Sequence, residues 1–177
     1  MPKTHHDPNK VSGLSIGTPW IPHTAELLRS PAWRGRSINT VRLIEFLEIE
    51  HTNHAGRENG NLCATYDQLV DFGIGRRFIY DAINQAEALR LLQVVQRGGW
   101  ALDRKNDRMS RFRLTYLPFK STDDRGAYYC EPTHEWRQIN REAAALITGR
   151  RPPKIFKQFD KGEPIEATNV HSLGARR

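Results

Sequence analysis

The sequence predicts an α+β domain that is mainly helical and carries one small β-hairpin. Apolar residues recur at helical spacing from Ser37 to about Asn53, and again from Gly75 to Leu89. Between Leu91 and Leu117, two apolar stretches flank a polar, glycine-containing segment, which is typical of a hairpin. A chain of 177 residues is long enough for one main core with appendages.

Composition divides the chain into four parts. Residues 1–19 mix Gly, Pro, Ser and His without a hydrophobic period, so we expect a flexible arm there. The main domain is predicted over residues 20–117, followed by a connection and a C-terminal helix over 118–149. Residues 150–177 are predicted to be a basic, disordered tail.

The first helices are predicted from their caps and breaks. A short helix begins near Thr24 and breaks at Pro31, because the residue before a proline disfavours helical geometry. Trp33 is expected to anchor this segment on the core. The wide apolar face from Ser37 to about Asn53 predicts the main scaffold helix, and the segment from His54 to Asn61 predicts a loop.

A helix pair and a hairpin come next. Leu62 to Ala64 is predicted to be a short strand, and Thr65 is the expected N-cap of a short helix that stops at Gly73. A second helix follows Gly75 and buries one stripe of apolar residues: Ile79, Ala82, Ile83 and Ala86. The strands Leu91 to Gln96 and Arg111 to Leu117 then form a hairpin with a long, basic tip.

The C-terminal part is predicted to hold one further helix. The stretch from Pro118 to Arg125 is interpreted as a polar connection, and Pro132 with Thr133 is a plausible helix start. The helix then extends to about Thr148, with one apolar face: Trp136, Ile139, Ala143, Leu146 and Ile147. That face packs either on its own domain or on a second copy, which makes the helix 133–148 the candidate interface of a homodimer.

One segment carries a resemblance to a known family. The run GIGRRFIYDAINQAEALRLLQVV, which begins at Gly73, resembles the second half of winged helix-turn-helix domains in bacterial transcription regulators and plasmid replication proteins. The match holds a Gly-Ile-Gly turn, basic residues at the start of the second helix and an Ala-Glu-Ala-Leu-Arg-Leu-Leu passage into the hairpin. Two positions depart from the family pattern: Ala86 replaces a larger apolar residue, and Arg90 replaces a glycine.

The resemblance implies binding to double-stranded DNA. The helix from Gly75 to Leu89 would lie in a major groove, with Arg77, Tyr80 and Asn84 facing the bases and Arg76 contacting phosphate. Gln85 is a further candidate contact on this helix. The hairpin would cross the backbone or enter the minor groove with five basic residues: Arg97, Arg104, Lys105, Arg108 and Arg111.

Charge agrees with a polyanionic partner. The net charge is +7, and residues 90–113 hold seven basic against two acidic residues, whereas residues 20–72 hold five basic against seven acidic ones. The tail from Gly149 to Arg177 holds seven basic against three acidic residues. Basic tails also serve solubility alone, and that alternative stays open for the tail.

Other chemistry has weaker support. His51 and His54, with Cys63 beyond them, resemble part of a metal site, but no second pair of ligands completes it, so we predict no metal. Neither GxxxxGK nor GxGxxG occurs, so no nucleotide site, cofactor or enzymatic activity is predicted. The four tryptophans are expected to be anchors, with Trp100, at the start of the hairpin, also a candidate for stacking on nucleic acid.

Three functions remain at this stage. A transcription regulator of the cytoplasm, associated with the nucleoid, is the first. A replication or partition protein of a plasmid or phage is the second, and a protein-interaction adaptor that does not touch DNA is the third. No apolar run approaches the ~20 residues that cross a bilayer, so no membrane contact is predicted. Cys63 and Cys130 are too few for a disulfide framework, which suits an intracellular protein.

Overall fold

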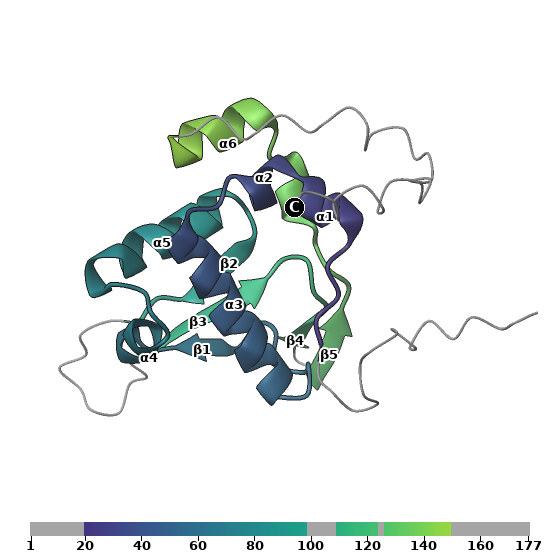
Figure 1. The fold of residues 1–177 in the computed structure, drawn as a ribbon. Helices are drawn as coiled ribbons and strands as arrows, with labels where there is room; N and C mark the ends of the chain where they lie inside the picture. Colours follow the sequence, from purple (N-terminus) through teal and green to yellow (C-terminus); the bar gives the residue numbers. More distant parts are fainter. Residues whose placement is uncertain (1–19, 99–108, 124–125, 150–177) are drawn as a thin grey trace, which may run out of the picture.

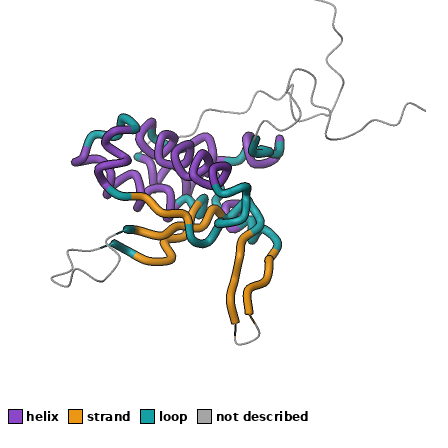
Figure 2. The backbone as a smooth tube through the Cα atoms, turned by 90° about the horizontal axis from the view of Figure 1, so that it is seen from below, coloured by secondary structure: helices purple, strands orange, loops and turns teal. Residues whose placement is uncertain are grey.

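A computed structural model describes residues 20–98, 109–123 and 126–149, and it has the predicted α+β class. Helices cover one side of a small antiparallel sheet, and a second hairpin projects from the body (Figures 1 and 2). The helices are α1 (Ala25–Arg29), α2 (Pro31–Arg34), α3 (Ile38–Asn53), α4 (Tyr66–Asp71), α5 (Arg76–Ala88), the 3-10 helix η1 (Glu135–Gln138) and α6 (Arg141–Thr148). The strands are β1 (Leu62–Ala64), β2 (Leu92–Gln96), β3 (Ser110–Leu114), β4 (Phe119–Asp123) and β5 (Gly126–Cys130).

The predicted helix starts at Thr24 and Ser37 and the predicted N-cap Thr65 are confirmed. The hydroxyl of Thr24 accepts a hydrogen bond from the Leu27 amide, and that of Ser37 accepts one from Thr40. Thr65 forms a full capping box with Gln68 at the start of α4. The structure differs at Pro31, which begins helix α2 instead of only ending α1, because Ser30 caps the new helix and proline suits its first position.

The first sheet has the strand order β1-β3-β2, and all its pairs are antiparallel. The predicted hairpin is therefore confirmed, but its second strand ends at Leu114 instead of Leu117. The chain turns there because the buried hydroxyl of Thr115 donates to the carbonyl oxygens of Arg90 and Leu91. Tyr116 and Leu117 are buried within this turn.

The polar connection expected from Pro118 to Arg125 is wrong. Residues 119–123 form β4, which pairs with β5 in a separate two-stranded sheet. In β5 two tyrosines are adjacent, so polar and apolar residues do not alternate as they do in a typical half-buried strand. The register places Lys120 opposite Tyr129 and Ser121 opposite Tyr128.

The single helix expected from Thr133 to Thr148 is also wrong. The segment is divided into η1 and α6, because the backbone at Ile139 is extended. Asn140 is then the N-cap of α6, and its side chain accepts a hydrogen bond from the Ala143 amide. Of the predicted apolar face, Trp136 and Ile139 are buried in the molecule's own core, whereas Leu146 is 86% exposed. This segment therefore folds back on its own domain, where α6 lies against α2 and α5 (Figure 1).

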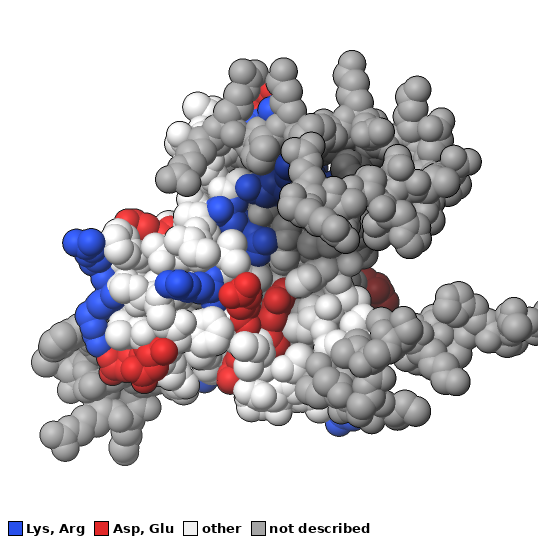
Figure 3. Space-filling model, viewed as in Figure 1, with Lys and Arg blue, Asp and Glu red and all other residues white. Residues whose placement is uncertain are grey.

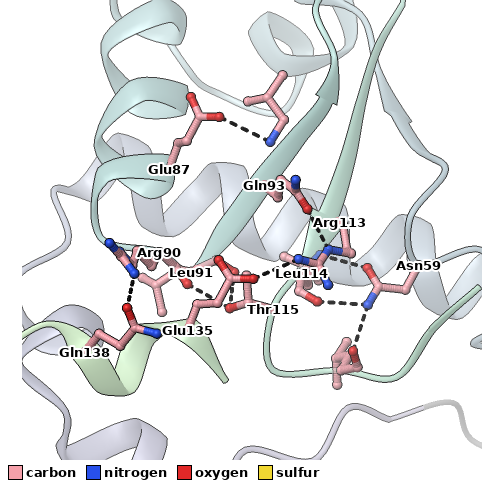
Figure 4. Close-up of polar contacts among 12 residues, drawn as sticks. Asn59, Glu87, Arg90, Leu91, Gln93, Arg113, Leu114, Thr115, Glu135 and Gln138 are labelled. Atoms are coloured by element: carbon pink, nitrogen blue, oxygen red, sulfur yellow. Dashed lines mark hydrogen bonds and ion pairs between the residues drawn. The ribbon is translucent and has the colours of Figure 1, made fainter. Parts of the chain in front are cut away.

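Both helices of the predicted pair end in the same way. Gly73 after α4 and Arg90 after α5 have positive φ, and the next amide in each case reaches back to the carbonyl three residues before the helix cap. Arginine therefore occupies a left-handed position, at φ +55°, that glycine normally fills. Its guanidinium hydrogen-bonds to Gln138, which ties the end of α5 to η1 (Figure 4).

A buried asparagine organises the junction between the two sheets. The Asn59 side chain, 1% exposed, accepts a hydrogen bond from the Leu114 amide at 2.7 Å. Its amide group donates to the carbonyl oxygens of Leu114, Leu117 and Pro118 at 2.9–3.0 Å (Figure 4). The predicted loop from His54 to Asn61 thus fixes the turn that leads from β3 into β4.

The core lies between α3, α5 and the first sheet. Its largest fully buried side chains include Leu43, Ile44, Leu47, Ile79, Leu89 and Phe112. Trp33 packs at its edge, as predicted, with its ring 5.6 Å from that of Tyr116. Within the described part of the chain, no helix is long and apolar enough to cross a membrane.

Replacing Asn59 with aspartate is expected to lower the free energy of unfolding by ~3 kcal/mol, because a carboxylate would face three carbonyl oxygens without a donor. Chemical denaturation measures the change. The exposed Asn53→Asp is the control, with an expected change within about 0.5 kcal/mol. Similar losses in the two variants would contradict the role of Asn59.

Stability is expected to fall as the pH drops below neutral, in part through His51. Burial lowers the pKa of His51, so the unfolded chain, with a histidine pKa of about 6.5, takes up the proton more readily. This contribution is complete above that pH and is lost below it. Denaturation from pH 7.5 to 5 is expected to show a shallower loss of stability for His51→Gln than for the wild type, and equal slopes would contradict the assignment.

Candidate nucleic-acid interface

The outward side of α5 is the centre of the candidate interface. Ile79, Ala82, Ile83 and Ala86 are buried against α3 and the sheet, as the spacing predicts. The opposite side presents Arg77, Tyr80 and Asp81 to solvent, with Asn84 half-buried one turn further along. We name this set, Arg77, Tyr80, Asp81 and Asn84, the outward face of α5.

Gln85 does not belong to the outward face. Its side-chain oxygen accepts hydrogen bonds from the Ser37 amide at 2.8 Å and from the Thr40 hydroxyl at 2.6 Å. Gln85 therefore fastens α5 to the start of α3, and its side-chain oxygen is engaged within the fold. The same pairing fixes the direction in which the outward face points.

The two arginines that open α5 have different surroundings. Arg76 is exposed and pairs with Asp67 on α4, which links the two helices of the pair. Arg77 stacks its guanidinium over the ring of Phe78, at 4.5 Å from the ring centre. Among the described residues of α5, Arg77 is the cation that lies in no ion pair, and its side chain is exposed.

A charged link holds the β2–β3 hairpin beside α5. Arg97, just after β2, pairs with Glu87 at 2.7 Å and lies 3.4 Å from the side-chain oxygen of Asn84. Glu87 also accepts from the Val94 amide of β2 at 3.4 Å (Figure 4). The Gly98 amide donates to the Ser110 hydroxyl and so closes the described part of the hairpin. The outward face and the base of the hairpin therefore form one connected unit.

Several arginines in and beside the β2–β3 hairpin form hydrogen bonds or ion pairs within the molecule. Arg113 is 7% exposed and pairs with Glu135 at 2.9 Å, with Gln93 as a second acceptor (Figure 4). Arg111 donates to the side-chain oxygen of Asn61, the residue just before β1, at 2.6 Å. Arg90 bonds to Gln138, as described above. Arg104, Lys105 and Arg108, together with Trp100, the arm of residues 1–19 and the tail of residues 150–177, lie outside the described residues.

Charge on the described surface is mixed in sign. Figure 3 shows Lys and Arg side chains interspersed with Asp and Glu on the face seen there, without one continuous basic area. Two acidic residues that sequence analysis did not assign, Asp67 and Glu87, account for part of this pattern, because each pairs with a predicted contact residue. Each lies nine or ten residues from its arginine, a separation without a helical or strand period that could have signalled the pair.

The histidines considered for a metal site are not assembled into one. His51 is buried at the end of α3, and His54 is exposed and contacts Glu50 at 3.0 Å. Across residues 20–98, 109–123 and 126–149, no group of three or more His, Cys, Asp or Glu side chains lies close enough to hold a metal ion.

The interface thus combines an exposed arginine and tyrosine on a well-anchored helix with a hairpin tied to the same helix. Such a surface offers hydrogen-bond donors and acceptors on a convex element that fits a groove. Comparison of the chain with models of protein families, with curated proteins and with solved structures found no match.

Proposed function

We propose that this protein binds double-stranded DNA in a sequence-specific manner through a winged helix-turn-helix domain and acts as a transcription regulator. In this proposal α5 enters the major groove, and the β2–β3 hairpin lies on the backbone or in the minor groove. The observation that carries it is the outward face of α5, which is exposed, polar and joined to the hairpin through Glu87 and Arg97.

The order of the elements supports the proposal. A scaffold helix, a short strand, two helices and a two-stranded hairpin follow one another as α3, β1, α4, α5, β2 and β3. The strand order β1-β3-β2 puts the short first strand beside the hairpin, which leaves α4 and α5 on one side. This is the order expected of a winged helix, in which the second helix of the pair reads DNA.

The surroundings of each side chain support a separate proposed role for each DNA-contact residue. Arg77 and Tyr80 are proposed to contact bases, because both are exposed and Arg77 has donors that no acidic side chain occupies. Arg76 is proposed to contact phosphate, with Asp67 holding it in place until phosphate competes for it. Asn84 and Arg97 are proposed to act together where α5 meets the hairpin.

Two alternatives have defined consequences. A replication or partition protein would use the same surface, so target-site selection and not binding alone distinguishes it from a regulator. A protein-interaction adaptor would show no DNA affinity near physiological salt, whereas DNA contacts make affinity fall steeply as salt rises.

Arg77→Ala is expected to weaken binding to the preferred DNA site by about 1–3 kcal/mol, which is roughly 5- to 150-fold in affinity, and to reduce discrimination between sequences. Fluorescence anisotropy with the preferred and a scrambled duplex measures both effects. Arg57→Ala removes the same charge from the exposed loop before β1 and is the matched control, with little change expected. A uniform loss for all sequences in Arg77→Ala would make it a phosphate contact instead.

Selection of bound sequences from random duplex DNA is expected to recover a motif with the wild-type chain and a degraded motif with Arg77→Ala. Affinity for that motif is expected to fall with salt at a slope of about −0.9 per phosphate contacted. Recovery of no motif, together with salt-independent or absent binding, would contradict the proposed function and favour the adaptor.

A further inference from the structure

The hairpin formed by β4 and β5 leaves one of its two strand edges open. It projects from the body in a direction different from that of the β2–β3 hairpin (Figure 2). Beside β4, the Lys120 amide donates to the carbonyl oxygen of Asn59 at 2.9 Å, so this edge is joined to the loop before β1. Among the described residues, no strand pairs with the other side of β5.

The hydrogen bond from the Lys120 amide to Asn59 determines in which direction the amides and carbonyls of β5 point. Lys120 turns its amide away from β5, so the pair of Lys120 with Tyr129 is not hydrogen-bonded. Tyr129 therefore turns its own amide and carbonyl away from β4, and alternation gives Ala127 the same direction. Among the described residues, no main-chain hydrogen bond reaches these outward groups of Ala127 and Tyr129.

The side chains of β5 include none of the types that usually prevent an edge strand from pairing with another chain. Its sequence, Gly-Ala-Tyr-Tyr-Cys, holds no charged residue and no proline, which are the usual means of preventing strand pairing. Tyr128 and Tyr129 are 46% and 59% exposed. A two-stranded hairpin is of marginal stability on its own, so added strands would stabilise it.

We infer that β5 pairs with β5 of a second copy of this chain, antiparallel and about a two-fold axis at Tyr128. Such a pairing is self-complementary: Ala127 of each copy faces Tyr129 of the other, which allows four main-chain hydrogen bonds. The two copies of Tyr128 then meet as a close, non-hydrogen-bonded pair. The result is a four-stranded sheet, β4-β5-β5-β4.

The uncharged sequence of β5 permits a second copy as the partner. The chain has a net charge of +7, so two copies repel each other wherever basic residues meet, and β5 offers a strand without charge. A polyanion would gain nothing from an uncharged edge. Pairing here also leaves the outward face of α5 uncovered, because the hairpin points away from it (Figures 1 and 2). The inference does not depend on DNA binding.

Cysteine cross-linking tests the geometry of the pairing. In a full-length Cys63→Ser, Cys130→Ser background, Tyr128→Cys is expected to form a disulfide-linked dimer on mild oxidation, because opposed residues of a non-hydrogen-bonded pair have Cβ atoms ~4.5 Å apart. Tyr80→Cys, at a tyrosine on α5 that is more exposed than Tyr128, is the control and is expected to stay monomeric on a non-reducing gel. Equal cross-linking of both variants would overturn the inference.

A proline substitution tests the hydrogen bonds themselves. Ala127→Pro removes an outward amide without breaking the β4–β5 ladder, whereas Ala127→Val keeps that amide and suits a strand. Sedimentation velocity over a hundredfold range of concentration is expected to show a monomer–dimer equilibrium for the wild type and Ala127→Val, and at least a tenfold weaker association for Ala127→Pro. Far-ultraviolet circular dichroism and thermal unfolding check that all three chains are folded.

In sedimentation velocity, three outcomes would overturn the inference. One is a wild-type chain that stays monomeric at every concentration. Another is association that Ala127→Pro leaves intact. The last is association that is lost instead in Leu146→Lys, which would place the interface on the exposed side of α6.

Discussion

The side chain of Asn59 is the constraint on which the arrangement of both sheets depends. Four hydrogen bonds join this one buried amide to the end of β3 and to the turn that follows. The backbone around it adds a further bond, from Lys120 to the Asn59 carbonyl. Gly60 makes this approach possible, because a Cβ there would lie 3.0 Å from the Lys120 carbonyl and its φ is +104°. The loop after α3 thus determines where β3 ends and where β4 begins.

The candidate interface depends on a second set of polar contacts, and these contacts decide how its charge is used. Gln85 sets the rotation of α5 on α3, and Glu87 sets the distance between α5 and the hairpin. Some arginines of the basic excess form ion pairs within the molecule. The clearest case is Arg113, which pairs with Glu135. Net charge therefore overestimates the charge available to a ligand, and the position of a single unpaired arginine becomes more informative than the sum.

Helices with polar caps and periodic apolar faces could be predicted from the sequence with near-correct limits. Thr24, Ser37 and Thr65 mark their starts, and the glycine after α4 marks an end. The second hairpin could not, because β4 is largely polar, β5 has two adjacent tyrosines without clear alternation, and the Asn59 junction that holds the hairpin is not local. The hydrogen bonds of Gln85 and the ion pair of Arg113 could not be predicted for the same reason, since their partners Ser37 and Glu135 are distant in sequence. The break at Asn140 had a visible signal, an N-cap residue inside an apolar period.

The bond from Lys120 to Asn59 has a consequence beyond the fold of one molecule. Because it ties β4 to the loop before β1, a strand added beside β4 would have to displace this bond, whereas no such bond is present on the outer side of β5 among the described residues. Growth of a fibril by repeated strand addition requires two open edges on each unit. The pairing inferred for β5 therefore leads to a closed pair of molecules, and the bond that anchors β4 disfavours the addition of a further strand on that side.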